Sequence, residues 1–260
     1  MSPYQTLLSS FSDGVTIITL NRPEFYNAFN EQMKKELFEA LKAAEKDSNV
    51  RCLVIGGAGK AFCSGQDLKE HSGSKRSLKE SLEKNYNPMI RKIRSMEKPI
   101  IAMVNGVAAG AGLSLALACD IRYMSANAKL IEVFIRIGLV PDSGSHWFLP
   151  RLVGMAKAFE YAATGRDISA EEAERVGLVN KIFPTETLEV ETMTLAKKLA
   201  QAPTKSIGLI KRTLNKSLNC SLDELLDYEA IIQQAASETE DHKEGVLAFL
   251  EKREAKFKGR

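Results

Sequence analysis

Residues 61–68 read AFCSGQDL, and residues 105–112 read NGVAAGAG. Each stretch follows an apolar run that is typical of a β-strand, at residues 52–55 and 100–104. Both stretches are rich in small residues, so a ligand can approach their backbone N–H groups closely. Two such loops that face one another supply two N–H donors to a single oxygen atom, which is the requirement of an oxyanion hole.

The composition is that of an ordinary globular protein. The chain has 260 residues, of which 44% are hydrophobic and 27% charged, enough for a sizeable core in one large domain or two small ones. Its net charge of +3 is too small to indicate a nucleic-acid surface, and no apolar stretch approaches the ~20 residues that cross a bilayer. We therefore expect no nucleic-acid or membrane partner. The first ten residues lack a signal-peptide pattern, so we expect a cytoplasmic protein.

Several alternative motifs are excluded by single residues. The GGAGK sequence at 56–60 fails as a phosphate-binding loop, because Val54 replaces a required Gly and Ala61 a required Ser or Thr. None of the four cysteines forms a C-x-x-C pair or a zinc-type spacing. Cys52 and Cys119 lie in apolar runs, and we expect them to be small core residues in a reducing compartment.

Strand and helix patterns alternate in the first half of the chain, which predicts an α/β sheet with crossover connections. Strands are predicted at 15–20, 51–55, 100–104 and 121–124. Helices are predicted from an Asn30 N-cap to about residue 45, at 77–96 and at 111–118.

The second half, from residue 143, is predicted to be mostly helical. Residues 169–172 and 221–224 match the capping-box pattern, and Thr239 begins the last predicted helix. Because no long linker separates the halves, we expect one structural unit in which the late helices are available for subunit contacts.

Further short motifs follow in order along the chain. They are LNRP at 20–23 with Asn27 and Ala28, CDIR at 119–122, IGLVPD at 137–142, LVG at 152–154, residues 173–179, and AFLEKR at 248–253. Together with the two loops, they make the chain resemble the crotonase, or enoyl-CoA hydratase/isomerase, superfamily over nearly its whole length. The resemblance implies a spiral of ββα repeats with a helical C-terminal region that builds trimers, often paired into hexamers. We expect residues 1–200 to form the crotonase core, and residues 201–260 to provide oligomerisation and CoA contacts.

The resemblance implies an acyl-CoA thioester as substrate. Two backbone N–H groups hold the thioester oxygen while an enolate charge builds on it, and the matching motifs place these donors at Gln66 and Ala111. Ala111 also opens a predicted helix, whose N-terminal dipole favours negative charge. Because backbone dipoles stabilise the enolate, the resemblance implies no metal and no cofactor beyond the CoA of the substrate.

The positions of two hydratase glutamates differ in this chain. Matching by motif places them at Ser114 and Phe134, neither of which can ionise. Glu132 lies two positions from Phe134, on the same face of an expected extended segment, and is a weak substitute. Efficient addition of water is therefore not expected.

Asp142 suggests another chemistry. It matches an acidic residue of the isomerase branches, most closely the branch that acts in the phenylacetate pathway on ring-1,2-epoxyphenylacetyl-CoA and also shifts a 3-enoyl double bond. A carboxylate there would take a proton from the acyl chain and return it at another carbon, if burial moves its pKa toward neutrality. The Pro-Asp-Ser-Gly sequence at 141–144 is also good turn chemistry, and the two interpretations do not exclude one another.

Binding residues carry over by the same resemblance. Ser64 and Gln66 match backbone contacts to adenine, Lys69 matches a phosphate contact, and Phe249 and Lys252 match CoA contacts from a neighbouring subunit. Tyr26 is expected at the entrance. The remaining candidate substrate-binding residues are Ala28, Gly65, Asp67, Leu68, Gly110 and Phe134.

Alternatives to the isomerase stay open at this point. One is a hydratase that adds water to 2-trans-enoyl-CoA, and another is dehalogenase, decarboxylase or thioesterase chemistry on the same scaffold. A third is a non-catalytic protein that binds acyl-CoA or RNA. The preferred acyl group is not predicted, although Phe25, Tyr86, Phe134 and Trp147 are expected to shape the pocket.

Overall fold

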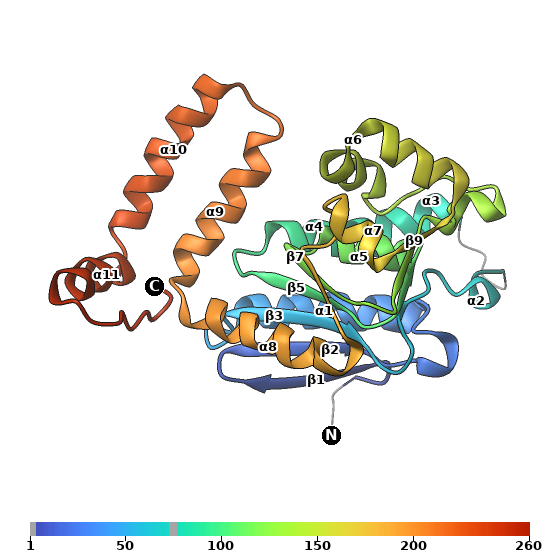
Figure 1. The fold of residues 1–260 in the computed structure, drawn as a ribbon, viewed down its shortest axis with the longest axis horizontal. Coiled ribbons are helices and arrows are strands. Elements are labelled where there is room, and N and C mark those ends of the chain that lie inside the picture. The colour runs from blue at the N-terminus through green and yellow to red at the C-terminus, as the bar shows by residue number, and fades with distance from the viewer. Residues whose placement is uncertain (1–3, 73–76) are drawn as a thin grey trace.

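A six-stranded sheet lies at the centre of the computed structural model, which describes residues 4–72 and 77–260. The strands lie in the order β1-β2-β3-β5-β7-β10 (Figure 1). Their bounds are β1 (Leu7–Ser12), β2 (Val15–Leu20), β3 (Cys52–Gly57), β5 (Ile100–Val104), β7 (Ile121–Ser125) and β10 (Lys181–Phe183). β1 and β2 are antiparallel, and all other neighbours in this sheet are parallel. The four predicted strands are confirmed to within two residues at each end.

A second, four-stranded sheet has the order β4-β6-β8-β9. Its strands have three residues each: β4 (Ala61–Cys63), β6 (Val107–Ala109), β8 (Lys129–Ile131) and β9 (Asp167–Ser169). The pairs β3/β4, β5/β6 and β7/β8 each place one strand in the first sheet and the next strand in the second, which confirms the predicted ββα spiral. β4 and β6 lie in segments that the sequence predicts as loops, because such short segments rich in Ala carry little strand signal.

Helices cover both faces of the six-stranded sheet. Along β3, Leu53 and Ile55 point to a core with α1 (Glu31–Lys46), α4 (Asn87–Ser95) and α5 (Ala111–Ala118). The alternate residues Cys52 and Val54 point to α8 (Thr185–Gln201) on the other face. Cys52 and Cys119 are buried free thiols, as predicted.

The Asn30 cap of α1 is confirmed, because its side chain accepts a hydrogen bond from the Met33 N–H. The predicted single helix at 77–96 is wrong: α3 (Leu78–Ser81) is followed by a π-helical turn, η2 (Leu82–Tyr86), and only then by α4. Pro88 lies in the first turn of α4 and has no N–H to donate to the preceding turn. The hydrogen-bonding pattern of the helix therefore changes from π-helical to α-helical after Tyr86.

The remaining described helices and 3₁₀ turns complete the body and the C-terminal arm. They are η1 (Pro23–Phe25), α2 (Leu68–Ser72), η3 (Val133–Ile137), α6 (Ser145–Thr164), α7 (Ala170–Arg175), α9 (Thr204–Ser217), α10 (Leu222–Ser237) and α11 (Glu240–Glu251). Figure 1 shows α9, α10 and α11 extending away from the two sheets. Among the described residues, no helix is long and apolar enough to cross a membrane.

One of the two predicted capping boxes forms in full. Ser221 and Glu224 exchange both hydrogen bonds at the start of α10, and Thr239 caps α11 as predicted. At α7, Ser169 accepts from the Glu172 N–H, but the Glu172 carboxylate pairs with Arg166 instead of returning to Ser169. The bidentate guanidinium is the stronger partner for that carboxylate.

Candidate active site

Two glycines let the 61–68 and 105–112 segments touch. Gly65 has φ +99°, and a Cβ built on it would lie 2.9 Å from the Ala109 carbonyl oxygen and 3.5 Å from the Ala111 nitrogen. A Cβ on Gly112 would lie 2.1 Å from the Cys63 carbonyl oxygen. A side chain at either position would push the segments apart, so the contact depends on glycine.

This contact brings the two predicted backbone donors to one place. Ala111 is the first residue of α5, so its N–H has no partner within the helix. An isolated β-bridge pairs Phe29 with Gln66. Its two hydrogen bonds run from the Phe29 N–H to the Gly65 carbonyl oxygen and from the Asp67 N–H to the Phe29 carbonyl oxygen, so the Gln66 N–H takes no part in it. In residues 4–72 and 77–260, neither the Gln66 nor the Ala111 N–H has a protein acceptor. Both residues line the same cavity, where a backbone N–H without a protein acceptor can donate to a ligand oxygen.

The Gln66 side chain is held by its own contacts. Its Oε1 accepts a 2.5 Å hydrogen bond from the Tyr86 hydroxyl and lies 3.4 Å from the buried Lys34 ammonium. Its Nε2 donates to the Phe29 carbonyl oxygen at 3.1 Å. The side chain therefore anchors the loop, while the backbone N–H stays free for a ligand.

Asp142 lies in the turn before α6 and lines the same cavity as Gln66 and Ala111. Burial raises the pKa of Asp142, while a hydrogen bond from the Ser143 hydroxyl (2.9 Å) and the charge of His146 oppose that rise. A carboxylate with a raised pKa exchanges protons more readily near neutrality. The position thus has the burial that a proton shuttle requires.

The cavity has a volume of about 280 Å³ and a mostly apolar wall. Eight of the predicted site residues line it: Ser64, Gly65, Gln66, Leu68, Gly110, Ala111, Phe134 and Asp142. Residues that the sequence analysis did not select complete the wall: Leu78, Ser81, Leu82, Val133, Ile137 and Leu139. Tyr86 also contributes, as expected for pocket shape, whereas Phe25 and Trp147 lie outside this wall. A mostly hydrophobic chamber with a few polar groups suits an acyl chain.

Other predicted binding residues have structural partners outside the cavity. Asp67 forms a 3.0 Å salt bridge with Arg22 and caps the start of α2. Arg22 also donates to the Ala28 carbonyl oxygen at 2.7 Å, so these three residues tie the entrance loops together. Tyr26 is exposed and accepts from the Ser64 N–H through its carbonyl oxygen. Lys69 is exposed on α2, outside the cavity wall.

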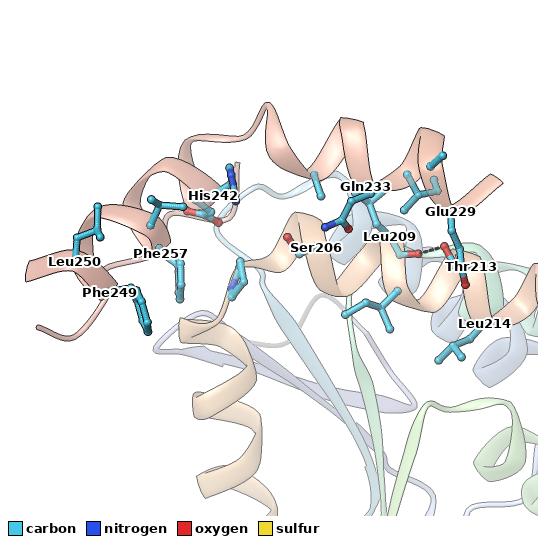
Figure 2. Close-up of a pocket in the computed structure, with 18 residues that line it drawn as sticks. Ser206, Leu209, Thr213, Leu214, Glu229, Gln233, His242, Phe249, Leu250 and Phe257 are labelled. Atoms are coloured by element: carbon cyan, nitrogen blue, oxygen red, sulfur yellow. Dashed lines mark hydrogen bonds between the residues drawn. The ribbon is translucent and has the colours of Figure 1, made fainter. Parts of the chain in front are cut away.

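A second, larger cavity lies between α9, α10 and α11 and has a volume of about 980 Å³. Figure 2 shows Phe249 and Leu250 at one end of it and Thr213 and Leu214 at the other. It contains neither oxyanion donor nor Asp142, so we do not place the chemistry there. Within one chain, Phe249 and Lys252 lie on this arm and do not line the 280 Å³ cavity. Their contact with CoA across a subunit boundary stays a prediction.

The two positions matched to hydratase glutamates are both built into the site. Ser114 lies on α5, one turn after Ala111, and is fully buried. Phe134 lies in η3 and lines the cavity. The expectation that Glu132 shares a face with Phe134 is wrong, because residues 133–137 form a 3₁₀ turn and the Glu132 side chain is buried behind the wall.

Comparison with known proteins identifies the family. The family model described as enoyl-CoA hydratase/isomerase matches residues 10–260. The chain belongs to the enoyl-CoA hydratase/isomerase family. It is therefore an enzyme of the hydratase/isomerase type.

Individual relatives carry both names. The chain is 43% identical over 258 residues to the 1,2-epoxyphenylacetyl-CoA isomerase of Escherichia coli, covering 98% of each chain. It is 41% identical over 257 residues to a probable enoyl-CoA hydratase of Rhodobacter capsulatus, covering 99% of each chain. A solved hydratase/isomerase structure from Mycobacterium abscessus superposes with a TM-score of 0.93 at 36% identity, covering 98% of this chain and all of that one. The enoyl-CoA hydratase structure from Bacillus anthracis gives 0.94 at 32% identity, with the same coverage.

Proposed function

We propose that this enzyme isomerises an acyl-CoA thioester by moving a proton. The Gln66 and Ala111 N–H groups hold the thioester oxygen, which makes a C–H bond of the acyl chain acidic. The Asp142 carboxylate takes that proton, and the electron pair enters the enolate. The carboxylic acid then returns the proton to another carbon, so the double bond moves and the enzyme is regenerated.

One observation carries this proposal. Asp142, a half-buried carboxyl group, lines the same cavity as Gln66 and Ala111, whose backbone N–H groups have no protein acceptor within residues 4–72 and 77–260. The positions that a hydratase would use to hold water carry a serine hydroxyl and a phenyl ring instead. The relatives named as isomerase and as hydratase agree with the family and leave the choice between the two reactions to this geometry.

A paired ultraviolet assay tests the reaction type. One sample contains a 3-enoyl-CoA and the other a 2-trans-enoyl-CoA, and both are followed at the absorbance of the conjugated enoyl thioester. We expect the absorbance to rise in the first sample and to change little in the second. A rapid fall in the second sample would identify a hydratase, and turnover of neither would favour a protein that only binds acyl-CoA.

The substitution Asp142→Asn tests the base directly. We expect kcat for the 3-enoyl substrate to fall by about 10²–10⁴-fold, the usual contribution of a positioned acid–base group. Asp13→Asn is the matched control, because Asp13 lies in an exposed turn of β1/β2 and Asn also tolerates its positive φ. Full activity of Asp142→Asn would overturn the proposal.

A further inference from the structure

Glu132 is an acidic residue with no solvent contact. It follows β8, at the start of η3, and its side chain is fully buried. Its Oε1 lies 2.9 Å from the Ser145 hydroxyl, and its Oε2 is buried without a hydrogen-bond partner in the described part of the chain. A buried carboxylate with one unsatisfied oxygen is costly, so the environment favours the neutral acid. Burial and the nearby Asp142 charge indeed raise the pKa of Glu132 to about 7.

A chain of hydroxyl groups leads from Glu132 to Asp142. The Ser145 hydroxyl lies 2.9 Å from the Ser114 hydroxyl. The Ser114 hydroxyl in turn lies 3.1 Å from the Asp142 backbone carbonyl oxygen. Ser145 also donates its backbone N–H to the same carbonyl oxygen at 2.9 Å. The chain thus ends on the backbone of the proposed base.

The direction of this chain depends on the proton of Glu132. Each serine hydroxyl has one proton to donate. When Glu132 is neutral, it donates to Ser145, Ser145 donates to Ser114, and Ser114 donates to the Asp142 carbonyl. When Glu132 is ionised, Ser145 must donate to it, and the single Ser114 proton then goes either to Ser145 or to a carbonyl oxygen, that of Asp142 or that of Gly110. Only the neutral acid therefore supplies every link at once.

The same chain touches the oxyanion hole. Ser114 is on α5, three residues after Ala111, and its hydroxyl is also 3.2 Å from the carbonyl oxygen of Gly110. Glu132 itself does not line the cavity. Its influence on the substrate must therefore pass through the serines to Ala111 and Asp142.

We propose that Glu132 is a positioning residue: as a neutral acid it drives the Ser145–Ser114 hydroxyl chain that fixes the Asp142 backbone against the first turn of α5. This inference rests on the proposed role of Asp142. The chain sets the distance between the proton-transfer group and the oxyanion donors. Small displacements of such groups lower turnover strongly, while binding of the remote parts of a substrate is less affected.

The experiment compares Glu132→Gln with Glu132→Met in the full-length enzyme at pH 6, below the folded-state pKa of Glu132, where the parent side chain is the neutral acid. The amide of Gln has the shape of the acid and can donate to Ser145, so we expect kcat within about threefold of the parent. Met has a similar volume and no donor, so we expect kcat to fall by about 10–100-fold while KM changes less than about threefold. Rescue by Gln distinguishes hydrogen-bond donation from the filling of space.

Ser145→Ala cuts the chain at its next link and keeps the test valid if Glu132→Met does not fold. We expect Ser145→Ala to lower kcat to a similar extent, and Glu132→Gln to add no further loss in that background, because coupled residues are not additive. Thr192→Val is the control: Thr192 is a fully buried hydroxyl on α8, across the sheet from the cavity, and its loss should leave kcat unchanged.

The outcomes separate the two proposals. Parental kcat in both Glu132→Met and Ser145→Ala would overturn the positioning role, and so would an equal loss in Glu132→Gln and Glu132→Met. If Asp142→Asn remains fully active, the proposed function fails instead, whatever the Glu132 variants do.

Discussion

Gly65 shows how much of the site depends on one missing side chain. Its φ of +99° and the 2.9 Å approach of the Ala109 carbonyl oxygen leave no room for a Cβ. In Gly65→Ala the segment must shift, and the adjacent Gln66 N–H moves with it. We expect kcat to fall by about 10²–10³-fold, the cost of one lost oxyanion donor.

Gly154 provides the matched control for that substitution. It also has positive φ (+76°), but a Cβ there would meet no atom within 4 Å, and it lies in the kink of α6 away from the cavity wall. Gly154→Ala should therefore lower the melting temperature through backbone strain without lowering kcat. Equal kcat losses in both variants would show that strain alone, and not the closeness of the two loops, governs the effect.

Glu132 also makes stability depend on pH. Because its folded-state pKa is about 7 and an exposed glutamate titrates near 4.5, the folded protein binds more protons between these values. Stability from this group is therefore lost as the pH rises from about 4.5 to 7. Glu132→Gln removes the cost of burying an ionised carboxylate. Its free energy of unfolding should therefore exceed that of the parent by on the order of 3 kcal/mol at pH 8.

Denaturant unfolding at pH 4.5 and pH 8 measures this difference. The advantage of Glu132→Gln should be absent at the lower pH, where the parent side chain is already neutral. The raised pKa of Asp142 acts in the same direction but is present in both proteins and cancels. An equal difference in free energy of unfolding between the two proteins at both pH values would contradict the raised folded-state pKa of Glu132.

At the scale of elements, the local sequence signals predicted most of the sheet. The strands at 15–20 and 100–104 and the Asn30 cap follow from apolar runs and capping chemistry, which depend on neighbouring residues only. The three-residue strands β4 and β6 carry no such signal, because AFC and VAA are too short and too rich in Ala to show a strand pattern. The π-helical turn that ends at Tyr86 precedes Pro88, and the helical periodicity of residues 77–96 does not reveal this interruption.

The candidate site was predicted where its residues lie in local motifs, and missed where it depends on contacts between distant segments. Gln66, Ala111 and Asp142 follow recognisable short motifs, and the structure brings all three to one cavity. Asp67 and Ala28 belong to equally recognisable motifs, yet their partner is Arg22, a contact between distant loops. The Glu132–Ser145–Ser114 chain joins three elements, and no spacing within the sequence indicates it.

The C-terminal arm, formed by α9, α10 and α11, leaves much apolar surface uncovered. Large apolar side chains on it are exposed, among them Ile231, Phe249 and Leu250, with Phe249 83% exposed. Apolar surface of this kind favours association. The trimer or hexamer implied by the resemblance would cover it, and would bring Phe249 and Lys252 toward the cavity of a neighbour.

Light scattering after size-exclusion chromatography measures this association. We expect a mass three or six times the 28.7 kDa of one chain, and a smaller species for Leu250→Asp, which places a charge on the exposed face of α11. Val190→Asp, an exposed apolar position on α8, is the matched control and should keep the parental mass. A monomer of the parent protein at micromolar concentration would contradict the expected assembly.

The two proposed oxyanion donors are main-chain groups, and this affects how such an enzyme can change its reaction. No substitution by another L-amino acid except proline removes the N–H of Gln66 or Ala111, so the part that stabilises charge is insulated from most point mutations. The side chains proposed to determine the reaction, at positions 142, 114 and 134, lie on separate elements and can be exchanged one at a time. A scaffold divided in this way can acquire a new acyl-CoA chemistry without first losing the ability to activate its substrate.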